Sequence, residues 1–416
     1  MEPSLDAFAD VPYTRSYHRE LEPGPLRVLA ALAGLAPPPA RGFSFCEVGS
    51  GAGVTLNALA AANPGARFVG VDVSDEHVAI AERAAREAGL GNVEHLRKDA
   101  RDLAQLGDER FDFVALHGVY SWVGADVRAA IAAFARDRLA PNGLLFVSYN
   151  ALPGWTALAP LRARIRDEAV RATGEPLERA RRAVLRAAEL RDAGDAALGT
   201  KAARAMIDVL LVADPRYVVH ELLTRDWEAF SSSDVADELA RVDLHRVGQL
   251  PLWENVLELA TPAGALDGLR GLGERDLEAK KDAAVGRLLR RDVFVRGAPR
   301  LDAAGSRAFF AETPFGATTR APASEVSLPH HTLTFSGSVY APLLDALGRR
   351  AAPLIDLART EPELASLPIA SVLEAARNLV IAGVAAPFVE RVDGIWELEA
   401  AAPDDDGAWT VDLAHD

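Results

Sequence analysis

The chain has 416 residues, 49% of them hydrophobic and 25% charged, which is long enough for two or three domains and typical of a globular protein. Its net charge of -15 argues against broad binding to nucleic acids or anionic membranes, because phosphates would be repelled. Cys46 is the only cysteine, which excludes an intrachain disulfide, and no stretch approaches the roughly 20 apolar residues of a transmembrane helix. The N-terminus also lacks the apolar stretch of a signal peptide, so we expect a cytoplasmic protein without nucleic-acid or membrane partners. A homodimer is left open.

The first part of the chain alternates between strand and helix patterns. An irregular arm over residues 1–25 precedes a helix over 25–35, which begins with proline and ends near Gly34. Strands are then predicted at residues 43–48, 67–73, 93–98, 111–117 and 143–149. Helices are predicted at residues 54–63, 75–88, 101–106 and 125–139. This alternation predicts parallel βαβ units and an α/β fold of the Rossmann-like type.

The rest of the chain predicts an insertion and an accessory domain. Strand patterns at residues 244–250 and 292–296 follow a long helical stretch, and we expect them to complete the same sheet. Beyond them, short helices and a hairpin turned at Asp393-Gly394 resemble a winged-helix fold with an acidic tail. The predicted domains are the sheet core with its arm, the helical insertion, the remainder of the core and the accessory domain, at residues 1–155, 156–224, 225–312 and 313–416.

The strongest local pattern comes at the end of the first strand. It is Glu47-Val48-Gly49-Ser50-Gly51-Ala52-Gly53, followed by a helix whose N-terminal amides point at a ligand. Glycines let the chain turn sharply and approach that ligand closely. The last glycine of the dinucleotide fingerprint G-x-G-x-x-G would fall on Val54, so the loop instead has the spacing E-x-G-x-G-x-G. That spacing resembles the loop that binds S-adenosylmethionine (SAM).

Two aspartates end the next two strands. Asp72 follows the loop by about 20 residues, where a ribose-binding carboxylate belongs, and a turn or helix-cap aspartate is the alternative. Asp99 could accept a hydrogen bond from the adenine amino group or cap the helix that follows, and the two interpretations are level. Val73 and Ala100, the residues after these aspartates, complete this part of the predicted cofactor site.

The fourth and fifth strands end in aromatic and polar residues. Because ligands bind at the carboxyl ends of strands in open α/β sheets, His117 is predicted to contact the cofactor, with a structural histidine as the alternative. Tyr120 and Trp122 are predicted to line a substrate pocket or to pack in the core. Tyr149 and Asn150 are predicted to face the same cleft.

Other chemistries have little support. His330 and His331 stand alone in a Pro/Ser-rich segment, so no metal site is predicted. A serine hydrolase would need a G-x-S-x-G elbow, which the sequence lacks.

Several motifs together resemble bacterial class I methyltransferases that carry a methyltransferase regulatory domain. They are the glycine loop with Asp72, Asp10-Val11-Pro12-Tyr13, and the runs at residues 117–122, 149–155, 217–221 and 292–297. The best characterised members of that family are rickettsial protein-lysine methyltransferases that act on outer-membrane proteins. The resemblance extends to about residue 390 and is strongest before residue 156.

This resemblance implies SAM as the cofactor and S-adenosylhomocysteine as the product. It assigns cofactor positions to Gly49, Gly51, Gly53, Asp72, Asp99 and His117. It also places Tyr13 on an arm that closes over SAM. After Trp155 the chain continues Thr156-Ala157-Leu158-Ala159, where some relatives have more aromatic and charged residues, so the identity of the substrate is not carried over.

The predicted reaction is methyl transfer from SAM to a protein or peptide nucleophile, with a lysine amine as one candidate. Alignment of the acceptor behind the methyl group contributes on the order of several kcal/mol. The candidates for an aromatic channel around the lysine chain are Tyr120, Trp122, Tyr149 and Trp155, and no general base is assigned. Two alternatives stay open: a methyltransferase for small molecules, and a non-catalytic partner protein that kept the fold.

Overall fold

The computed structural model describes the chain apart from short segments. The described residues are 11, 15–319, 321–388, 392–393, 398–400 and 411–413. The chain forms two compact units. The first comprises Met1–Leu21, Arg41–Gly248 and Gly264–Ala298, and the second comprises Glu22–Ala40, Gln249–Ala263 and Pro299–Asp416.

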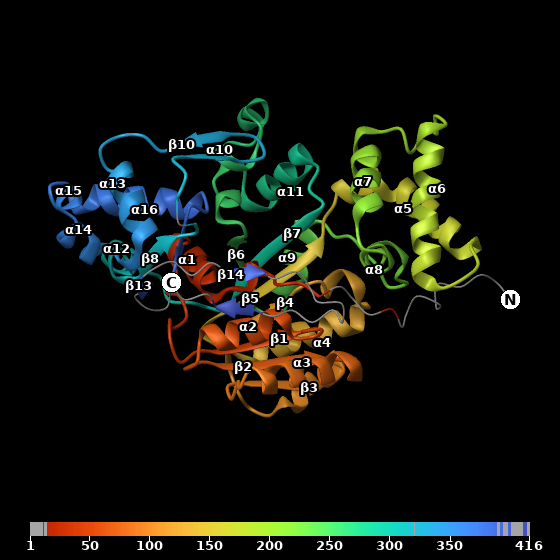
Figure 1. Ribbon diagram of the computed structural model, residues 1–416, viewed down its shortest axis with the longest axis horizontal. Helices are drawn as coiled ribbons and strands as arrows, with labels where there is room; N and C mark the ends of the chain where they lie inside the picture. The colour runs from red at the N-terminus through yellow and green to blue at the C-terminus, as the bar shows by residue number, and fades with distance from the viewer. Residues whose placement is uncertain are drawn as a thin grey trace. The chain divides into compact units, whose positions relative to one another are not determined.

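The first unit is built on a seven-stranded sheet with the strand order β3-β2-β1-β4-β5-β7-β6 (Figure 1). Its strands are β1 (Ser44–Val48), β2 (Arg67–Asp72), β3 (Val93–Arg97), β4 (Phe111–Leu116), β5 (Leu139–Asn150), β6 (His245–Gln249) and β7 (Leu289–Val295). Strands β1 to β5 are parallel, so their carboxyl ends meet at one edge, whereas β7 is antiparallel to β5. The predicted Rossmann-like fold is confirmed, and the two late strands complete the same sheet.

Helices flank this sheet. They are α2 (Val54–Ala62), α3 (Asp75–Glu87), η3 (Ala100–Leu106), η4 (Tyr120–Trp122), α4 (Ala125–Arg138), α9 (Ser232–Ala240), η7 (Ala263–Gly268) and α11 (Glu274–Val285), with the short turn η2 (Arg19–Leu21) before them. Helix α3 begins directly after β2 because the Ser74 hydroxyl accepts the backbone N–H of His77, and Asp75 and Glu76 favour its positive end. This cap fixes where the chain leaves the carboxyl end of β2.

Aromatic packing fixes the centre of the sheet. Phe45 on β1 stacks on Phe113 on β4, with 5.9 Å between the ring centroids, and both side chains are fully buried. Removal of such rings from water contributes about 1.5–3 kcal/mol each. The packing therefore holds β1 and β4, the two strands that carry the glycine loop and His117, side by side.

A helical insertion lies between β5 and β6, and Figure 1 shows it grouped apart from the sheet. Its elements are α5 (Gly154–Arg171), α6 (Pro176–Asp192), α7 (Lys201–Val212), α8 (Pro215–Val218) and the π-helical turn η5 (Val219–Leu223). Ala180, Val184 and Ala187 recur at helical spacing on α6 and are buried, which turns the arginines of that helix outward. The helical prediction for this stretch is confirmed.

The second unit combines helices with a small sheet. Its helices are α1 (Pro23–Leu32), η6 (Leu252–Asn255), α10 (Leu257–Ala260), α12 (Ala303–Glu312), α13 (Tyr340–Arg349), α14 (Leu354–Thr360), α15 (Pro362–Ala365) and α16 (Ile369–Ile381). Its strands are β8 (Pro314–Ala317), β9 (Glu325–Ser327), β10 (Thr332–Thr334), β11 (Arg350–Pro353), β12 (Ala385–Pro387), β13 (Val392–Asp393), β14 (Leu398–Ala400) and β15 (Val411–Leu413). Leu343, Leu347, Leu357 and Leu379 are fully buried and form part of its core.

The hairpin predicted around Asp393-Gly394 is not formed by the strands that the structure describes there. Strand β12 pairs with β8, β13 with β11, and β14 with β15. The predicted arms were residues 386–392 and 394–399, so β12 and β13 belong to the first arm and its turn and β14 to the second, and each of them pairs with a strand outside the predicted hairpin. The rest of the predicted hairpin lies outside the described residues, and a winged-helix arrangement is not confirmed.

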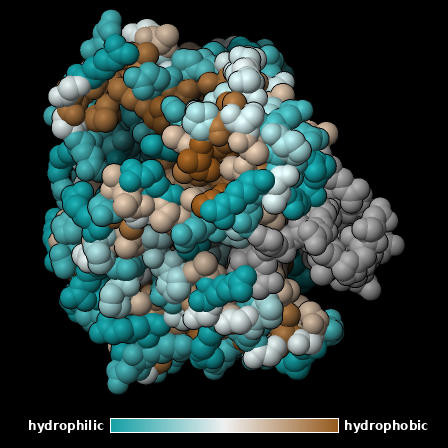
Figure 2. Space-filling model, turned by 90° about the vertical axis from the view of Figure 1, so that its left-hand side faces the viewer, coloured by the Kyte–Doolittle hydropathy of each residue, from teal (hydrophilic) through white to brown (hydrophobic). Residues whose placement is uncertain are grey.

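Within the described part of the chain, no helix combines the length and the apolar character needed to cross a membrane. Figure 2 shows a largely hydrophilic face with hydrophobic patches gathered in its upper half.

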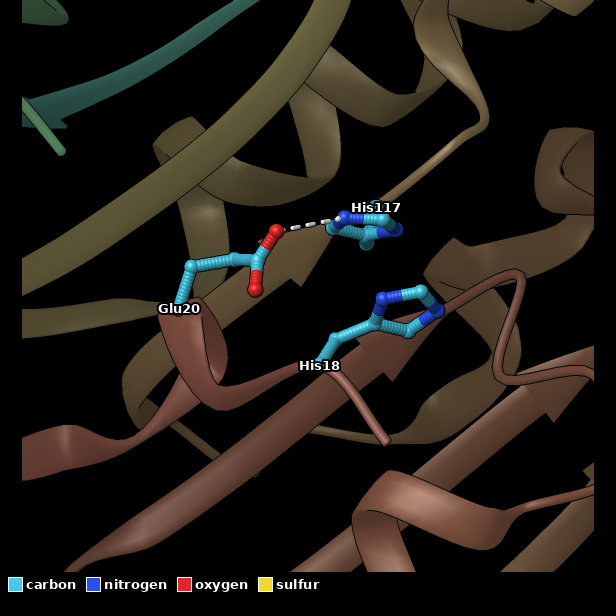
Figure 3. A group of neighbouring side chains, drawn as sticks. All are labelled: His18, Glu20 and His117. Atoms are coloured by element: carbon cyan, nitrogen blue, oxygen red, sulfur yellow. Dashed lines mark hydrogen bonds and ion pairs between the residues drawn. The ribbon is translucent and has the colours of Figure 1, made fainter. Parts of the chain in front are cut away.

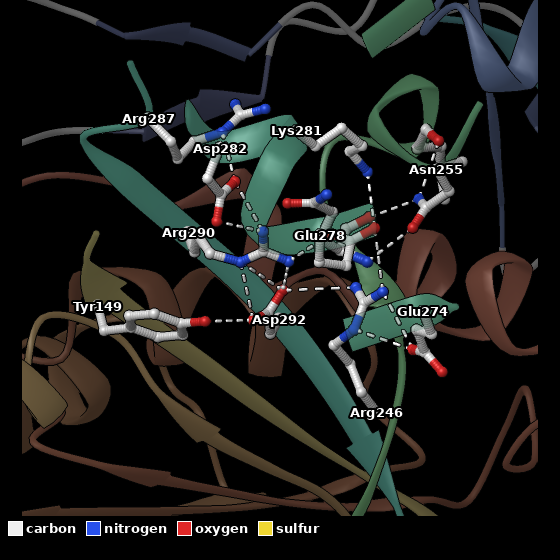
Figure 4. Close-up of polar contacts among 12 residues, drawn as sticks. Tyr149, Arg246, Asn255, Glu274, Glu278, Lys281, Asp282, Arg287, Arg290 and Asp292 are labelled. Carbon is white, nitrogen blue, oxygen red and sulfur yellow. Dashed lines mark hydrogen bonds and ion pairs between the residues drawn. The ribbon is translucent and has the colours of Figure 1, made fainter. Parts of the chain in front are cut away.

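A buried ionic cluster joins α11 to the sheet of the first unit (Figure 4). Arg290 on β7 is fully buried, and its guanidinium donates to Asp282, Glu278 and Asp292, each at 2.8 Å. The Tyr149 hydroxyl on β5 donates to Asp292 at 2.5 Å. The remaining charged members are Arg246, Glu274, Lys281 and Arg287. This Arg290 cluster thus balances four cations with four carboxylates.

Candidate active site

The loop after β1 turns through three glycines. Gly49, Gly51 and Gly53 have positive φ angles of 79°, 53° and 72°, a region that favours glycine. A methyl group on Gly49 would lie 2.3 Å from Cγ2 of Val119, which leaves no room for a side chain. Gly53 directly precedes α2, so the backbone amides at the start of that helix are presented at the loop. The loop therefore offers backbone, rather than side chains, to a ligand.

Asp72 ties this loop to the end of β2. Its carboxylate accepts the backbone N–H of Gly51 and of Ser74, both at 2.9 Å, and lies 3.3 Å from Nδ1 of His77. Burial alone would raise the pKa of Asp72, but the hydrogen bonds from His77, Ser74 and Gly51 outweigh it and lower that pKa. Asp72 is therefore ionised at neutral pH and can accept from ribose hydroxyls.

Glu47 lies at the end of β1, beneath the loop. It is buried, and its Oε2 has no hydrogen-bond partner among the described residues. Burial, and secondarily the charge of Asp72, raise the pKa of Glu47 to about 8, so the neutral acid predominates at pH 7. A protonated carboxyl group can donate to a ligand as well as accept from it.

The residues after the two strand-end aspartates differ in exposure. Val73 is 62% exposed, which is unusual for a large apolar side chain and suits contact with a flat apolar ligand group such as adenine. Asp99 accepts the backbone N–H of Arg101 at 2.9 Å and pairs with its guanidinium, so it caps η3 in the structure. Ala100 is half-buried at the first position of η3. A contact of Asp99 with adenine stays a prediction.

His117 stands at the carboxyl end of β4 with two residues from the segment before α1 (Figure 3). Its Nε2 lies 3.1 Å from a carboxylate oxygen of Glu20, and its ring stacks on that of His18 with 3.8 Å between centroids. Arg291 also donates to Glu20, at 2.8 Å. Burial alone would raise the pKa of Glu20, but His117 and Arg291 together lower it to about 2, so the carboxylate is ionised.

His18, Glu20 and His117 bring their potential ligand atoms within 4.8 Å of one another. The two imidazole planes, however, are only 24° apart, so their lone pairs lie in nearly parallel planes rather than converging on one ion. Burial and the neighbouring His117 lower the pKa of His18 to about 4, which keeps its ring neutral. We therefore interpret the group as a hydrogen-bonded cluster that orients His117.

Sequence reasoning missed His18 and Glu20. Glu20 is 97 residues from His117, and no local spacing links them. The segment before α1 contains a histidine and a glutamate, but nothing in the sequence indicates that they contact His117. Tyr13, predicted to lie on the same arm, is outside the described residues.

The four predicted pocket residues occupy different environments. Tyr120 is 2% exposed and packs against Phe230, and Tyr149 is fully buried with its hydroxyl bound to Asp292. Trp122 is half-buried and donates its indole N–H to the carbonyl of His220.

Asn150 is the exception, because its side-chain nitrogen is buried without a partner. Successive strand residues point to opposite faces, so Tyr149 and Asn150 do not face one cleft, and we leave Tyr149 out of the proposed pocket.

Together these residues fit a SAM site. Asp72 supplies a carboxylate for ribose, the glycine loop presents backbone amides in a conformation that favours glycine, and Val73 offers an exposed apolar side chain. Glu47 and Asn150 each keep a buried polar atom without a partner in the described structure. Such orphaned atoms are costly unless a ligand or water satisfies them. The fold and site define the class as that of the SAM-dependent methyltransferases with a class I sheet.

Comparison with known proteins also points to methyltransferases. Residues 46–145 match the family described as "Methyltransferase domain", and residues 214–296 match the "Predicted methyltransferase regulatory domain". These two matches confirm the predicted resemblance to methyltransferases that carry a regulatory domain.

Individual relatives are similar over part of the chain or over its fold. An uncharacterized protein of Synechocystis is 29% identical over 298 residues, which cover 69% of this chain and 58% of the relative. An uncharacterized protein of Rickettsia prowazekii is 34% identical over 158 residues, which cover 38% of this chain and 62% of the relative. The chain thus spans less than two thirds of either relative. PKMT2 from Rickettsia typhi, solved in complex with AdoHcy, shares the fold with a TM-score of 0.71 at 21% identity, covering 91% of this chain and 77% of that one.

Proposed function

We propose that this protein transfers a methyl group from SAM to a protein or peptide, with the side-chain amine of lysine as the acceptor. The observation that carries the proposal is the site at the carboxyl edge of the sheet, where the glycine loop, Asp72 and Val73 meet the requirements of the cofactor. The regulatory domain and the helical insertion extend the chain well beyond a minimal methyltransferase domain. That extra surface favours a macromolecular acceptor over a metabolite.

The proposed cofactor residues divide into three tasks. Asp72 binds the ribose hydroxyls, while Val73 packs against the adenine. Gly49, Gly51 and Gly53 allow backbone amides to approach the amino-acid end of the ligand. When bound, SAM supplies a methyl group on a positively charged sulfur.

His117, held by Glu20, stands at the strand end nearest the proposed transfer site and helps to place the ligand. We place the approach of the acceptor on the side of β5, where Asn150 keeps an amide nitrogen unpartnered among the described residues. Trp155, at the start of α5, contacts the ring of Trp227 edge-on with 4.8 Å between centroids.

Tyr149 is fully buried and Tyr120 is 2% exposed, whereas Trp122 and Trp227 are half-buried. We therefore propose Trp122 and Trp227, with Trp155 packed against Trp227, as the aromatic wall that the acceptor passes. No general base is assigned.

An assay with methyl-labelled SAM tests the proposal. The full chain is incubated with a mixture of lysine-bearing proteins, and with the same mixture after its lysines have been blocked by acetylation. We expect label on lysine Nε, located by mass spectrometry, only in the unblocked mixture. Label that is indifferent to blocking, or that appears only on added metabolites, would contradict a lysine acceptor and favour the small-molecule alternative. The cytoplasmic location and a homodimer stay predictions.

A further inference from the structure

A cavity of about 390 Å³ lies in the first unit, between α5 and the segment that follows the insertion. The side chains that give it chemical character are Trp155, Arg162, Arg166, Asp167 and Trp227, with two alanines completing the lining. The Trp155 end of this insertion cavity lies near the end of β5, because the indole N–H of Trp155 and the backbone N–H of Ala151 both donate to the carbonyl of Leu288. Asn150, the last residue of β5, keeps an unpartnered amide nitrogen in the described structure. The cavity is therefore placed where an acceptor would approach.

Two arginines one turn apart on α5 face this cavity without a carboxylate partner. Arg162 lies over the ring of Trp227, 4.0 Å from its centroid, and donates only to the carbonyl of Thr224. Among the described residues neither Arg162 nor Arg166 forms an ion pair, although Asp167 lines the same cavity. Arg164, between them in the chain, is paired with Asp195 at 3.5 Å. The lining arginines are thus the unpaired ones.

The surroundings of Arg162 disfavour its charged form. Burial, and secondarily the charge of Arg166, lower the pKa of Arg162 to about 10. Two like charges brought together with partial loss of water disfavour each other unless an anion is added. An anion in the cavity would relieve both effects.

Two further donors in this region lack partners. The Nε of Arg162 and the indole Nε1 of Trp227 are both buried without a hydrogen bond in the described structure. A guanidinium and an indole are donors only, so the group that satisfies them must be an acceptor. Carboxylates and phosphates have the matching geometry for the arginine fork.

The charge of the insertion points to an acidic ligand of modest size. Residues 156–224 contain 12 Lys and Arg against 10 Asp and Glu, a net charge of +2, in a chain whose total is -15. This local excess attracts an acidic segment, but it is too small for the extended positive stripe that nucleic acids require.

We propose that the insertion cavity binds an acidic side chain, Asp or Glu, of the methyl-acceptor protein. The inference rests on the proposed function and adds a specificity determinant to it. A lysine ammonium would be repelled by Arg162 and Arg166, so the cavity does not hold the methylated residue itself. The cavity instead binds a carboxylate that lies near that lysine in the acceptor. The tryptophans pack against the aliphatic part of the same segment.

Two synthetic peptides of equal length test this inference. In one a central lysine is flanked by glutamates, and in the other by glutamines. Each is titrated by calorimetry into the full chain saturated with S-adenosylhomocysteine, at 0.15 M salt. We expect the glutamate peptide to bind at least tenfold more tightly. The variant Arg166→Gln should abolish that preference, whereas the control Arg181→Gln, which alters an exposed arginine on α6, should keep it.

The outcomes separate this inference from the proposed function. Equal affinity for the two peptides, or a glutamate preference that survives Arg166→Gln, would overturn the assignment of the cavity. Tighter binding of a single-stranded oligonucleotide than of the glutamate peptide would overturn the choice of a protein ligand. An Arg166-dependent preference in a protein that labels no lysine would support the cavity and contradict the lysine acceptor.

Discussion

The Arg290 cluster and the insertion cavity both contain several arginines, but only the arginines of the cluster are paired with carboxylates of the described chain. In the cluster, the guanidinium of Arg290 meets three carboxylates at 2.8 Å, and the group as a whole is balanced. In the cavity, Arg162 and Arg166 have no carboxylate partner among the described residues. In the cluster, carboxylates of the chain balance the cations, even where Nη1 of Arg246 and Nε of Arg287 lie 3.9 and 3.5 Å from them without a hydrogen bond in the described structure. In the cavity, no carboxylate of the described chain balances the two arginines.

The difference separates groups that hold the fold from groups that await a ligand. A buried charge is tolerated when partners satisfy it, as they do for Arg290. The carboxyl edge of the sheet resembles the cavity in this respect, because Glu47 and Asn150 also keep unpartnered atoms. Changes in the cluster should therefore affect stability most, and changes at the edge should affect binding most.

The largest effect is expected from Arg290→Met. This change leaves Asp282, Asp292 and Glu278 without their shared cation in a buried site, so the free energy of unfolding should fall by about 3–5 kcal/mol. Urea unfolding monitored by circular dichroism measures it. The matched control is Arg186→Met, which removes an exposed pair with Glu189 and should cost less than about 1 kcal/mol. Equal effects of the two variants would show that burial of the cluster does not matter.

Glu47 links stability to pH. Burial and Asp72 raise the pKa of Glu47 from its ordinary value of 4.5 to about 8, so the folded state keeps a proton that the unfolded state loses in that interval. The stability of the wild type should therefore fall, relative to Glu47→Gln, as pH rises from 4.5 to about 8, by up to about 1.4 kcal/mol per pH unit. Urea unfolding across this range checks it, and parallel pH profiles of the two proteins would refute it.

Asp72→Ala should act on binding. Loss of the carboxylate that accepts from ribose should raise the dissociation constant for SAM at least tenfold, which corresponds to about 1.5–3 kcal/mol. Calorimetry measures this constant directly. The control Asp75→Asn changes a neighbouring carboxylate whose side chain is 83% exposed, and it should leave the constant unchanged. An unaltered constant in the Asp72 variant would remove the residue from the cofactor site.

Sequence reasoning succeeded where local chemistry determines structure. Strand and helix periodicity predicted β1 to β5 and the helices between them to within a few residues, except that β5 is longer than predicted. These elements are predictable because buried strands and amphipathic helices have characteristic hydrophobic patterns in the sequence. The glycine loop was equally readable, since three positive φ angles within five residues demand glycine.

It failed where distant segments meet. Glu20 and His117, and likewise Tyr149 and Asp292, are brought together only by the strand order. The hairpin at Asp393 was predicted from local turn chemistry, whereas the strands described on either side of that turn, β13 and β14, pair with β11 and β15. The insertion cavity combines α5 with Trp227, about 60 residues further on, so no motif marks it.

A titration of the full chain with SAM, S-adenosylhomocysteine and NAD by calorimetry tests the central claim most directly. The glycine loop, ionised Asp72 and exposed Val73 predict micromolar binding of SAM and of its demethylated product, with no binding of NAD. Failure of the folded protein to bind SAM would contradict the account and leave only a Rossmann-like scaffold.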